Sequence, residues 1–168
     1  MSRTLILIRH AKSDWSAPVQ DRDRPLAPRG LRQAPSVGEW LAVRDAVPTY
    51  VVVSPAQRAQ QTWSLVREAL ATQGCDVDAI ETHTVEDAYT FSGRDLMDVL
   101  GEIPTNARVA AVVGHNPAME ELIETLTGEV VTMKTSALAV VETDAQSWEA
   151  GGGRLRVAGR PADESLGA

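Results

Sequence analysis

The chain has 168 residues, of which 43% are hydrophobic and only 4% aromatic, with one cysteine and a formal net charge of -7. This length suits a single domain whose core of Ala, Val, Leu and Ile needs no disulfide or structural metal. The acidic charge argues against nonspecific binding to nucleic acid or to anionic membranes. Because the lone Cys75 cannot form an internal disulfide, and neither a signal peptide nor a bilayer-spanning run is present, we expect a cytoplasmic protein.

The first predicted strand spans residues 4–8, whose apolar character is typical of a strand buried on both faces. Four polar side chains follow it directly: Arg9, His10, Lys12 and Ser13. Open α/β sheets place their ligand sites at such carboxyl ends of strands. Residues 1–34 also carry seven basic side chains against three acidic ones, which favours a local anion site. Residues 14–28 are polar and aperiodic, and we expect an ordered loop there.

The next predicted elements are a helix, a strand and a second helix. Residues 28–44 have helical spacing, with Pro35 expected to kink or restart the helix, and residues 50–53 form a buried strand. Ser54 as N-cap and Pro55 as first helical residue predict the next helix start, and Gly74 its end. The stripes expected to face the core are Leu31, Ala34, Gly38 and Leu41, then Ala59, Trp63, Val66 and Leu70.

The second half of the chain repeats this alternation. Residues 80–84 predict a weaker strand, Ser92 caps a short helix that ends before Pro104, and residues 109–113 form a buried strand. Asn116 as N-cap and Pro117 as first helical residue start a helix that ends at Gly128. Residues 137–142 and 154–157 predict two late strands with a hairpin turn at residues 151–153. The buried stripes are Leu96, Leu100 and Ile103, then Met119, Leu122, Ile123 and Leu126.

Strands that alternate with helices predict an α/β fold, a three-layer α/β/α sandwich around a mainly parallel central sheet. No repeat or linker indicates a second domain. We therefore expect one domain over residues 1–158 and a mobile C-terminal tail over residues 159–168.

Functional side chains follow three of the predicted strands. Arg9 and His10 end the first, Arg58 lies in the first helical turn after the second, and His115 follows the strand at residues 109–113. Since the carboxyl ends of parallel strands share one edge of a sheet, these groups should meet beside two helix N-termini. Forked guanidinium donors and helix N-termini both favour anions, so the expected ligand is a tetrahedral oxyanion, above all a phosphoryl group.

The motifs at these positions resemble the signature of the histidine phosphatase superfamily: Arg9-His10-Ala11, Ser54-Pro55-x-x-Arg58-Ala59-x-x-Thr62 and Gly114-His115-Asn116-Pro117. The resemblance extends to Asp21-x-x-Arg24-x-Leu26-x-x-x-Gly30 and Thr135-x-Ala137-Leu138, and the short chain is most similar to the SixA-type phosphohistidine phosphatases. It implies a phosphoglycerate-mutase-like fold and a phosphatase that uses neither a metal nor a cofactor.

The resemblance also implies roles for individual residues. His10 would attack phosphorus in line and carry a phosphohistidine intermediate that water hydrolyses. Arg9, Arg58 and His115 would bind the equatorial oxygens and stabilise the transition state. The guanidiniums would keep His10 neutral, as a nucleophile requires.

The general acid is less sharply indicated. Glu86 is expected to be the general acid in preference to Asp87, and the alternative is that both are ordinary surface residues. A phosphohistidine substrate would need no strong acid, because imidazole is already a fair leaving group. Lys12, Ser13 and Asn116 are expected to contact the substrate, with completion of the turn after the strand as the alternative role of Lys12 and Ser13.

Departures from the larger family branches indicate the kind of substrate. Ala11 stands where many relatives have glycine, and the insertions that build a lid in the mutase and sugar-phosphate branches are absent, as is a Gly-x-Trp-Glu-Gly stretch. We therefore expect an open site whose partner is a phosphohistidine protein or a small phosphorylated metabolite such as a phosphomonoester. Trp15 follows the motif loop and is expected to line the mouth of the pocket.

Two alternatives to a metal-independent enzyme are a zinc site and a non-catalytic phosphate-binding module. His10 and His115 could be zinc ligands, but the remaining histidine and cysteine, His83 and Cys75, stand apart from them and the arginines would repel a cation. A non-catalytic phosphate-binding module of the same fold is the alternative to an enzyme, although such a module would gain little from the neutral imidazole of His10.

Overall fold

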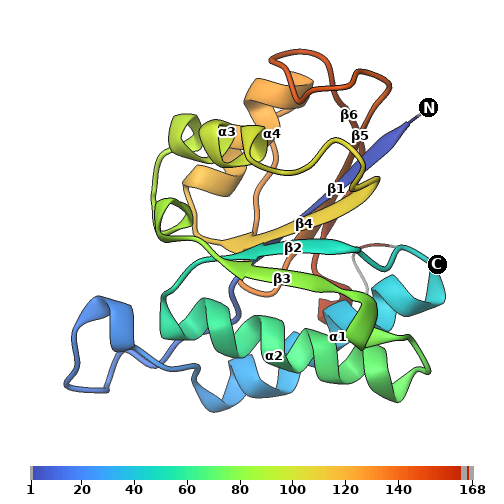
Figure 1. The fold of residues 1–168 in the computed structure, drawn as a ribbon. Coiled ribbons are helices and arrows are strands. Elements are labelled where there is room, and N and C mark those ends of the chain that lie inside the picture. Colours follow the sequence, from blue (N-terminus) through green and yellow to red (C-terminus); the bar gives the residue numbers. More distant parts are fainter. Residues whose placement is uncertain (1, 164–165, 167–168) are drawn as a thin grey trace.

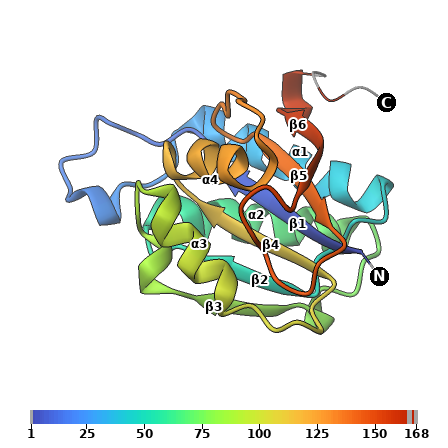
Figure 2. The ribbon, with the colours of Figure 1, turned by 90° about the horizontal axis from the view of Figure 1, so that it is seen from above.

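A six-stranded sheet lies between two pairs of helices (Figures 1 and 2) in the computed structural model, which describes residues 2–163 and 166. The strands are β1 (Arg3–Arg9), β2 (Tyr50–Val53), β3 (Glu81–Thr84), β4 (Val109–Gly114), β5 (Leu138–Thr143) and β6 (Arg154–Gly159). The helices are α1 (Pro28–Val43), α2 (Gln57–Thr72), α3 (Gly93–Gly101) and α4 (Ala118–Thr127). Short 3-10 helices lie at η1 (Asp21–Asp23), η2 (Val77–Ala79), η3 (Glu86–Ala88) and η4 (Pro161–Asp163).

The strand order is β3-β2-β4-β1-β5-β6. Strands β1 to β4 pair in parallel, whereas β5 runs antiparallel to both β1 and β6. The prediction of an α/β sandwich around a mainly parallel sheet is therefore confirmed. In Figure 1 the carboxyl ends of the parallel strands point to the left, toward the loop that carries η1.

The central strand β1 divides the core into two halves. Leu5 and Leu7 pack with α3 and α4 on one face, while Ile6 and Ile8 pack with α1 and α2 on the other. All four side chains are fully buried, as a strand covered on both faces requires. Figure 1 shows the two helix pairs on opposite sides of the sheet.

The helix α1 differs from the prediction in two ways. It continues through Pro35 without a restart, and Leu31 is 45% exposed rather than on the buried face. The face that packs inward contains Ala34, Val37 and Leu41, together with Gly38, where a Cβ atom would lie 2.4 Å from the Val66 carbonyl oxygen. This close contact between α1 and α2 holds the helix although Pro35 removes one backbone donor.

The predicted N-caps Ser54 and Asn116 are both wrong. Helix α2 begins at Gln57 after Ala56, two residues later than its predicted cap implied, and α4 begins at Ala118 after Pro117, one residue later. Ser54 and Asn116 instead make contacts at the site described below. Ser92 is the N-cap residue of α3 as predicted, although its side chain makes no capping hydrogen bond.

The C-terminal boundary also differs from the prediction. Strand β6 runs to Gly159, and η4 follows, with Asp163 carrying an ion pair to Lys134 at 3.9 Å. The boundary expected at residue 158 thus falls inside a strand, because pairing with β5 continues as far as Gly159. Residues 164, 165, 167 and 168 of the expected tail lie outside the described residues. Within the described ranges, no helix is both long and apolar enough to cross a membrane.

Candidate active site

The register of the sheet brings the predicted groups together. Arg9 at the end of β1 is paired with Gly114 at the end of β4, and Val53 of β2 is paired with Val113. His10, Ser54 and His115 are therefore the next residues of three adjacent strands. This edge contains a topological switch point, because β1 and β4 are neighbouring parallel strands whose following helices, α1 and α4, pack on opposite faces of the sheet.

His10 is buried and its ring is oriented from one side. Its Nδ1 donates a hydrogen bond to the carbonyl oxygen of Ala11 at 2.8 Å, so the lone pair of the neutral ring is on Nε2. The Arg58 Nε donates to this Nε2 at 3.3 Å. Burial, together with the positive charges of Arg58 and Arg9, lowers the pKa of His10 from 6.5 to about 3, against the contribution of the Ala11 hydrogen bond. The imidazole is therefore neutral at physiological pH.

The backbone beside His10 is held by α2 and α1. The Ala11 N–H donates to Thr62 Oγ1 at 2.9 Å, and this hydroxyl in turn donates to the Arg58 carbonyl at 2.7 Å. Gly30 of α1 lies against the next residue, because a Cβ atom there would be 2.2 Å from the Lys12 carbonyl oxygen. Glycine at this position permits the helix to contact the turn that carries His10.

Arg58 is 1% exposed and projects from the first turn of α2. Besides its contact with His10, it donates from Nη1 to the Asp21 carbonyl oxygen at 2.7 Å and from Nη2 to Asp21 Oδ2 at 3.0 Å. The two η nitrogens keep one further N–H each, which suits a forked anion.

Asp21 is the residue that organises the arginines, and the sequence analysis did not assign it to the site. Its carboxylate accepts from Arg58, from Arg24 Nη1 at 2.7 Å, and from the Tyr89 hydroxyl in a short contact. Partial burial opposes its ionisation, but the hydrogen bonds from Tyr89 and Arg58 outweigh that effect and lower its pKa to about 2. The only sequence signal was its place in the Asp21-x-x-Arg24 motif, because its partner Arg58 lies 37 residues away.

His115 presents one ring nitrogen to the site. Its Nε2 lies 2.8 Å from Ser54 Oγ, which already accepts the Ala56 N–H at 3.2 Å and so has its own proton to donate to the imidazole. A neutral His115 then carries its proton on Nδ1, a buried atom with no protein partner among the described residues. Burial, followed by the charge of Arg58, lowers the pKa of His115 to about 4. The ring is thus a neutral donor beside His10, with ring centroids 5.2 Å apart.

Arg9 and Asn116 are anchored on the same carbonyl group. Arg9 Nη1 and Asn116 Nδ2 each donate to the Met133 oxygen at 2.8 Å, and Asn116 also donates to Glu120 Oε2 at 3.0 Å. This anchoring explains why Asn116 does not cap α4. Its buried Oδ1 has no partner in the part of the chain that the structure describes.

These groups line one cavity of about 200 Å³. Four cationic side chains and one carboxylate surround it, and the two histidines contribute neutral rings. The cavity therefore favours an anion of the size of a phosphoryl group, with the rest of the ligand at its open side. Its lining residues are Arg9, His10, Lys12, Ser13, Trp15, Asp21, Arg24, Arg58, Phe91, His115, Asn116 and Thr135.

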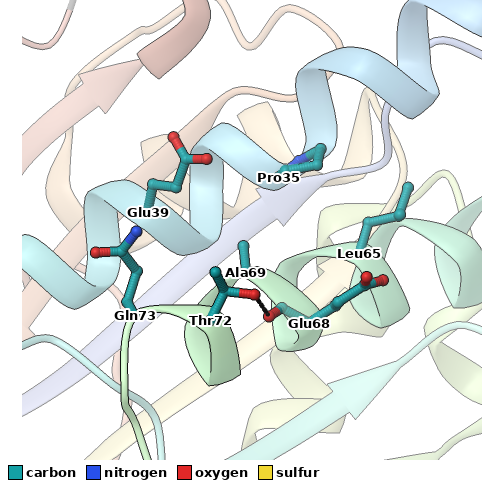
Figure 3. Close-up of a pocket in the computed structure, with 7 residues that line it drawn as sticks. All are labelled: Pro35, Glu39, Leu65, Glu68, Ala69, Thr72 and Gln73. Atoms are coloured by element: carbon teal, nitrogen blue, oxygen red, sulfur yellow. Dashed lines mark hydrogen bonds between the residues drawn. The ribbon is translucent and has the colours of Figure 1, made fainter.

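A second pocket of similar size, about 180 Å³, lies between α1 and α2 (Figure 3). Its seven lining residues include the carboxylates Glu39 and Glu68 and no cationic side chain. Within it the Thr72 hydroxyl donates a hydrogen bond to the Glu68 carbonyl oxygen at 3.0 Å. This pocket lacks the charge that an oxyanion needs.

Seven of the eight predicted site residues lie around the first cavity, and the eighth does not. Glu86 is 69% exposed in its side chain and forms a bidentate pair with Arg22 at 2.6 and 3.0 Å. It lines a separate surface depression with Asp87 and Tyr89. Trp15 lines the mouth of the His10 cavity as expected, whereas Arg24, Phe91 and Thr135 join it without having been predicted.

Among the described residues, no group of three or more His, Cys, Asp or Glu side chains is arranged to hold a metal ion. His83 lies on β3, stacked against Tyr50 with a centroid distance of 4.7 Å, and Cys75 is a free thiol. The charge around His10 comes from guanidinium groups, which repel a cation.

Comparisons with known proteins agree with this geometry. The sequence model of the histidine phosphatase superfamily (branch 1) matches residues 5–83. An uncharacterized protein of Mycobacterium tuberculosis is 33% identical over 161 residues, which cover 95% of this chain and 93% of that protein. A 2,3-bisphosphoglycerate-dependent phosphoglycerate mutase of Methylorubrum extorquens is 30% identical over 96 residues, 55% of this chain and 45% of the mutase.

Two solved structures are similar over almost the whole chain. A protein provisionally named phosphohistidine phosphatase SixA, from Nakamurella multipartitia, has a TM-score of 0.77 at 27% identity, covering 96% of this chain and 97% of that one. A protein with the same provisional name from Agrobacterium tumefaciens has a TM-score of 0.79 at 26% identity, covering 95% and 98%. The chain described here belongs to the histidine phosphatase superfamily, in its SixA-type branch.

Proposed function

We propose that the protein is a metal-independent phosphatase that hydrolyses a phosphoryl group through a phosphohistidine intermediate on His10. The observation that carries this proposal is the orientation of the His10 ring. Its Nδ1 is tied to the Ala11 carbonyl, so the Nε2 lone pair is the one left for attack, and it stands at the Arg58 side of the cavity. A neutral imidazole held in this way has the protonation state and the orientation that nucleophilic attack on phosphorus requires.

The reaction has two displacement steps at phosphorus. In the first, the Nε2–P bond forms while the bond from phosphorus to the leaving atom breaks, and the leaving atom keeps the electron pair and takes a proton from solvent water at the mouth of the cavity. In the second, a water oxygen attacks phosphorus, the Nε2–P bond breaks, and inorganic phosphate is released. His10 returns to its neutral form, with the proton on Nδ1 still donated to the Ala11 carbonyl oxygen in a hydrogen bond.

The surrounding donors stabilise the charge that moves during both steps. Arg58 offers its two remaining η protons, His115 its Nδ1 proton, and Arg9 its guanidinium. Because these groups are already fixed by Asp21, Ser54 and Met133, they need little reorganisation when the phosphoryl group arrives.

Lys12, Ser13 and Asn116 are proposed substrate contacts, since all three line the cavity. Ser13 Oγ accepts from Arg24 Nε at 3.0 Å, so its own proton is free for an oxygen of the ligand. Glu86 was predicted as the general acid, but its pairing with Arg22 outside the cavity gives that role no support.

The substrate is proposed to be a phosphohistidine protein or a small phosphomonoester. Two solved structures that are similar over almost the whole chain are provisionally named phosphohistidine phosphatases, and the cavity here, of about 200 Å³, suits a phosphoryl group. A protein-borne phosphoryl group can therefore reach His10 without a lid having to move. Placement in the cytoplasm remains part of the proposal.

The test is phosphate release by the wild type and by His10→Ala, with His83→Ala as the matched histidine control on β3. We expect His10→Ala to lose turnover and His83→Ala to keep it. After a rapid quench, acid-labile phosphate should be found on the wild type and on His83→Ala, and not on His10→Ala. Full activity of His10→Ala would overturn the nucleophile assignment. Phosphate binding without any turnover by the wild type would identify the non-catalytic binding module instead.

A further inference from the structure

Two exposed aromatic rings flank the mouth of the His10 cavity. Trp15 is 72% exposed and Phe91 is 52% exposed, although large apolar side chains are normally covered. Both line the cavity, yet they come from different parts of the chain, the loop after β1 and the segment between η3 and α3. Both segments lie at the left of Figure 1, where the carboxyl ends of the parallel strands are found.

The Trp15 ring is held in place on one face and free on the other. The guanidinium of Arg24 stacks on it, with Cζ 3.6 Å from the ring centroid. Arg24 is itself only 7% exposed and is fixed by Ser13 and Asp21. A ring held by a buried partner loses little conformational entropy when a ligand covers its open face.

The Phe91 ring is fixed by edge contacts with two other rings. Its centroid lies 5.7 Å from that of His115 and 6.3 Å from that of Tyr89, at interplanar angles of 63° and 78°. Phe91 therefore stands beside His115, one of the proposed phosphoryl-binding groups, at the wall of the same cavity. We call Trp15 and Phe91 the aromatic rim.

In-line attack determines where the leaving group must lie. The nucleophile is at the buried floor of the cavity, because His10 is only 7% exposed. The leaving atom lies on the opposite side of phosphorus, which directs it outward toward the mouth. The group attached to that atom therefore meets the rim.

The acids near the cavity limit the leaving groups that suit it. Asp21 is the one carboxyl among the described lining residues, and it is ionised with a pKa of about 2, held by Tyr89 and Arg58. Burial, followed by the hydrogen bond to Asp21, raises the pKa of Tyr89, whose hydroxyl proton is already donated to Asp21. The site thus favours a leaving group that departs without a strong acid, such as an imidazole nitrogen or a phenolic oxygen.

From this geometry, and on the basis of the proposed function, we infer that the aromatic rim selects substrates whose phosphoryl group is carried by a planar ring, the imidazole of a phosphohistidine side chain above all. The ring stacks on the open face of Trp15 and against the edge of Phe91 while phosphorus lies at His10. An aliphatic phosphate ester reaches the same phosphoryl site without gaining this contact.

The inference is tested by the ratio of kcat/KM on two substrates with the same P–N bond, N-phosphoimidazole, which has a ring, and phosphoramidate, which has none. Trp15→Ala and Phe91→Ala are expected to lower this ratio by about two- to tenfold each, as the loss of one aromatic contact does. Trp15→Phe should restore it. Because both substrates are measured on the same preparation, a reduced folded fraction cancels from the ratio.

Trp40→Ala is the matched control, since Trp40 on α1 also carries a stacked guanidinium, from Arg44 with Cζ at 4.3 Å, but does not line the cavity. It is expected to leave the ratio unchanged. An equal loss on both substrates in the rim variants, or no loss on either, would overturn the inference.

The same variants separate this inference from the proposed substrate class. If the wild type cleaves P–O bonds and no P–N bond, the phosphohistidine proposal fails, and the rim is judged on phenyl phosphate, an aromatic ester, against acetyl phosphate, an acyl phosphate without a ring. A lowered ratio for that pair in Trp15→Ala and Phe91→Ala still supports a rim that selects rings, and an unchanged ratio overturns it. Absence of turnover on all four substrates would overturn both proposals.

Discussion

Acidification from about pH 7 to about pH 5 is expected to weaken the fold, because His10 and His115 are buried in the neutral form. Burial lowers their pKa values from 6.5 to about 3 and about 4, respectively. In the unfolded chain both side chains recover an ordinary pKa and take up protons below about pH 6.5. The unfolded state therefore binds more protons than the native state in this window, and native stability falls as the pH falls.

The size of the effect follows from these values. At about pH 5, each histidine that is protonated only in the unfolded state lowers the free energy of unfolding by about 2 kcal/mol. The two histidines together should contribute about 4 kcal/mol, a large share of the total stability of a domain of this size. Solvent screens these two groups little, because His10 is 7% exposed and His115 is 1% exposed.

Urea unfolding at the two pH values measures this loss, with His10→Gln as the comparison. The variant has one titrating buried histidine fewer, so its loss between about pH 7 and about pH 5 should be about half that of the wild type. His83→Gln serves as the control for an exposed histidine. A wild type equally stable at both pH values, or a His10→Gln protein that loses as much as the wild type, would refute the neutral buried state of His10.

Two further predictions concern groups that hold the site. Arg58→Ala should lower kcat/KM by about 10² to 10³, equivalent to about 3 to 4 kcal/mol of transition-state stabilisation, and Arg58→Lys should recover only part of it because an ammonium has no fork. Unchanged kinetics in Arg58→Ala would contradict its role as a phosphoryl clamp. Gly30→Ala should destabilise the fold by about 1 to 3 kcal/mol in thermal melting, because the new Cβ atom would lie 2.2 Å from the Lys12 carbonyl oxygen. Gly101→Ala, at a helical position with open space, should be neutral or slightly stabilising.

The positions of the strands were predictable because each central strand is a short apolar run bounded by polar residues or breakers. Strand β1 is the clearest example, since Leu5 to Ile8 are completely buried. Parallel pairing then brings the residues after β1, β2 and β4 to one edge, so His10 and His115 could be expected to meet. This part of the site follows from local pattern and topology alone.

The N-caps could not be predicted in the same way, because Ser54 and Asn116 serve the site instead of the helix. The Ser54 hydroxyl contacts His115, and Asn116 shares the Met133 carbonyl with Arg9. The N-cap rule considers only neighbouring residues, so it fails where the side chain binds a residue distant in the sequence, as is expected at functional positions. Helix α2 consequently begins two residues later, and α4 one residue later, than the sequence signals indicate.

Asp21 shows the other limit of sequence reasoning. It lies in an aperiodic loop, and each of its contacts with Arg58 and Tyr89 depends on how that loop folds over the sheet edge. Glu86 is the opposite case: it was predicted as a site residue, but its side chain points away from the cavity and pairs with Arg22. The identity of a carboxylate says little about whether it faces a cavity, because the orientation of a loop is set by contacts distant in the sequence.

Asp21 also explains how so much positive charge can be kept around the His10 cavity. A guanidinium as buried as that of Arg58 is costly unless it is paired, and Asp21 supplies both a carboxylate and a carbonyl oxygen to it. Three of the five Arg58 N–H groups are used by Asp21 and His10, which leaves two for a ligand. The carboxylate is half exposed and can remain solvated while the phosphoryl group binds on the other side of the guanidinium. The same residue therefore stabilises the buried guanidinium and fixes the orientation of the two N–H groups that the proposed function assigns to the phosphoryl group.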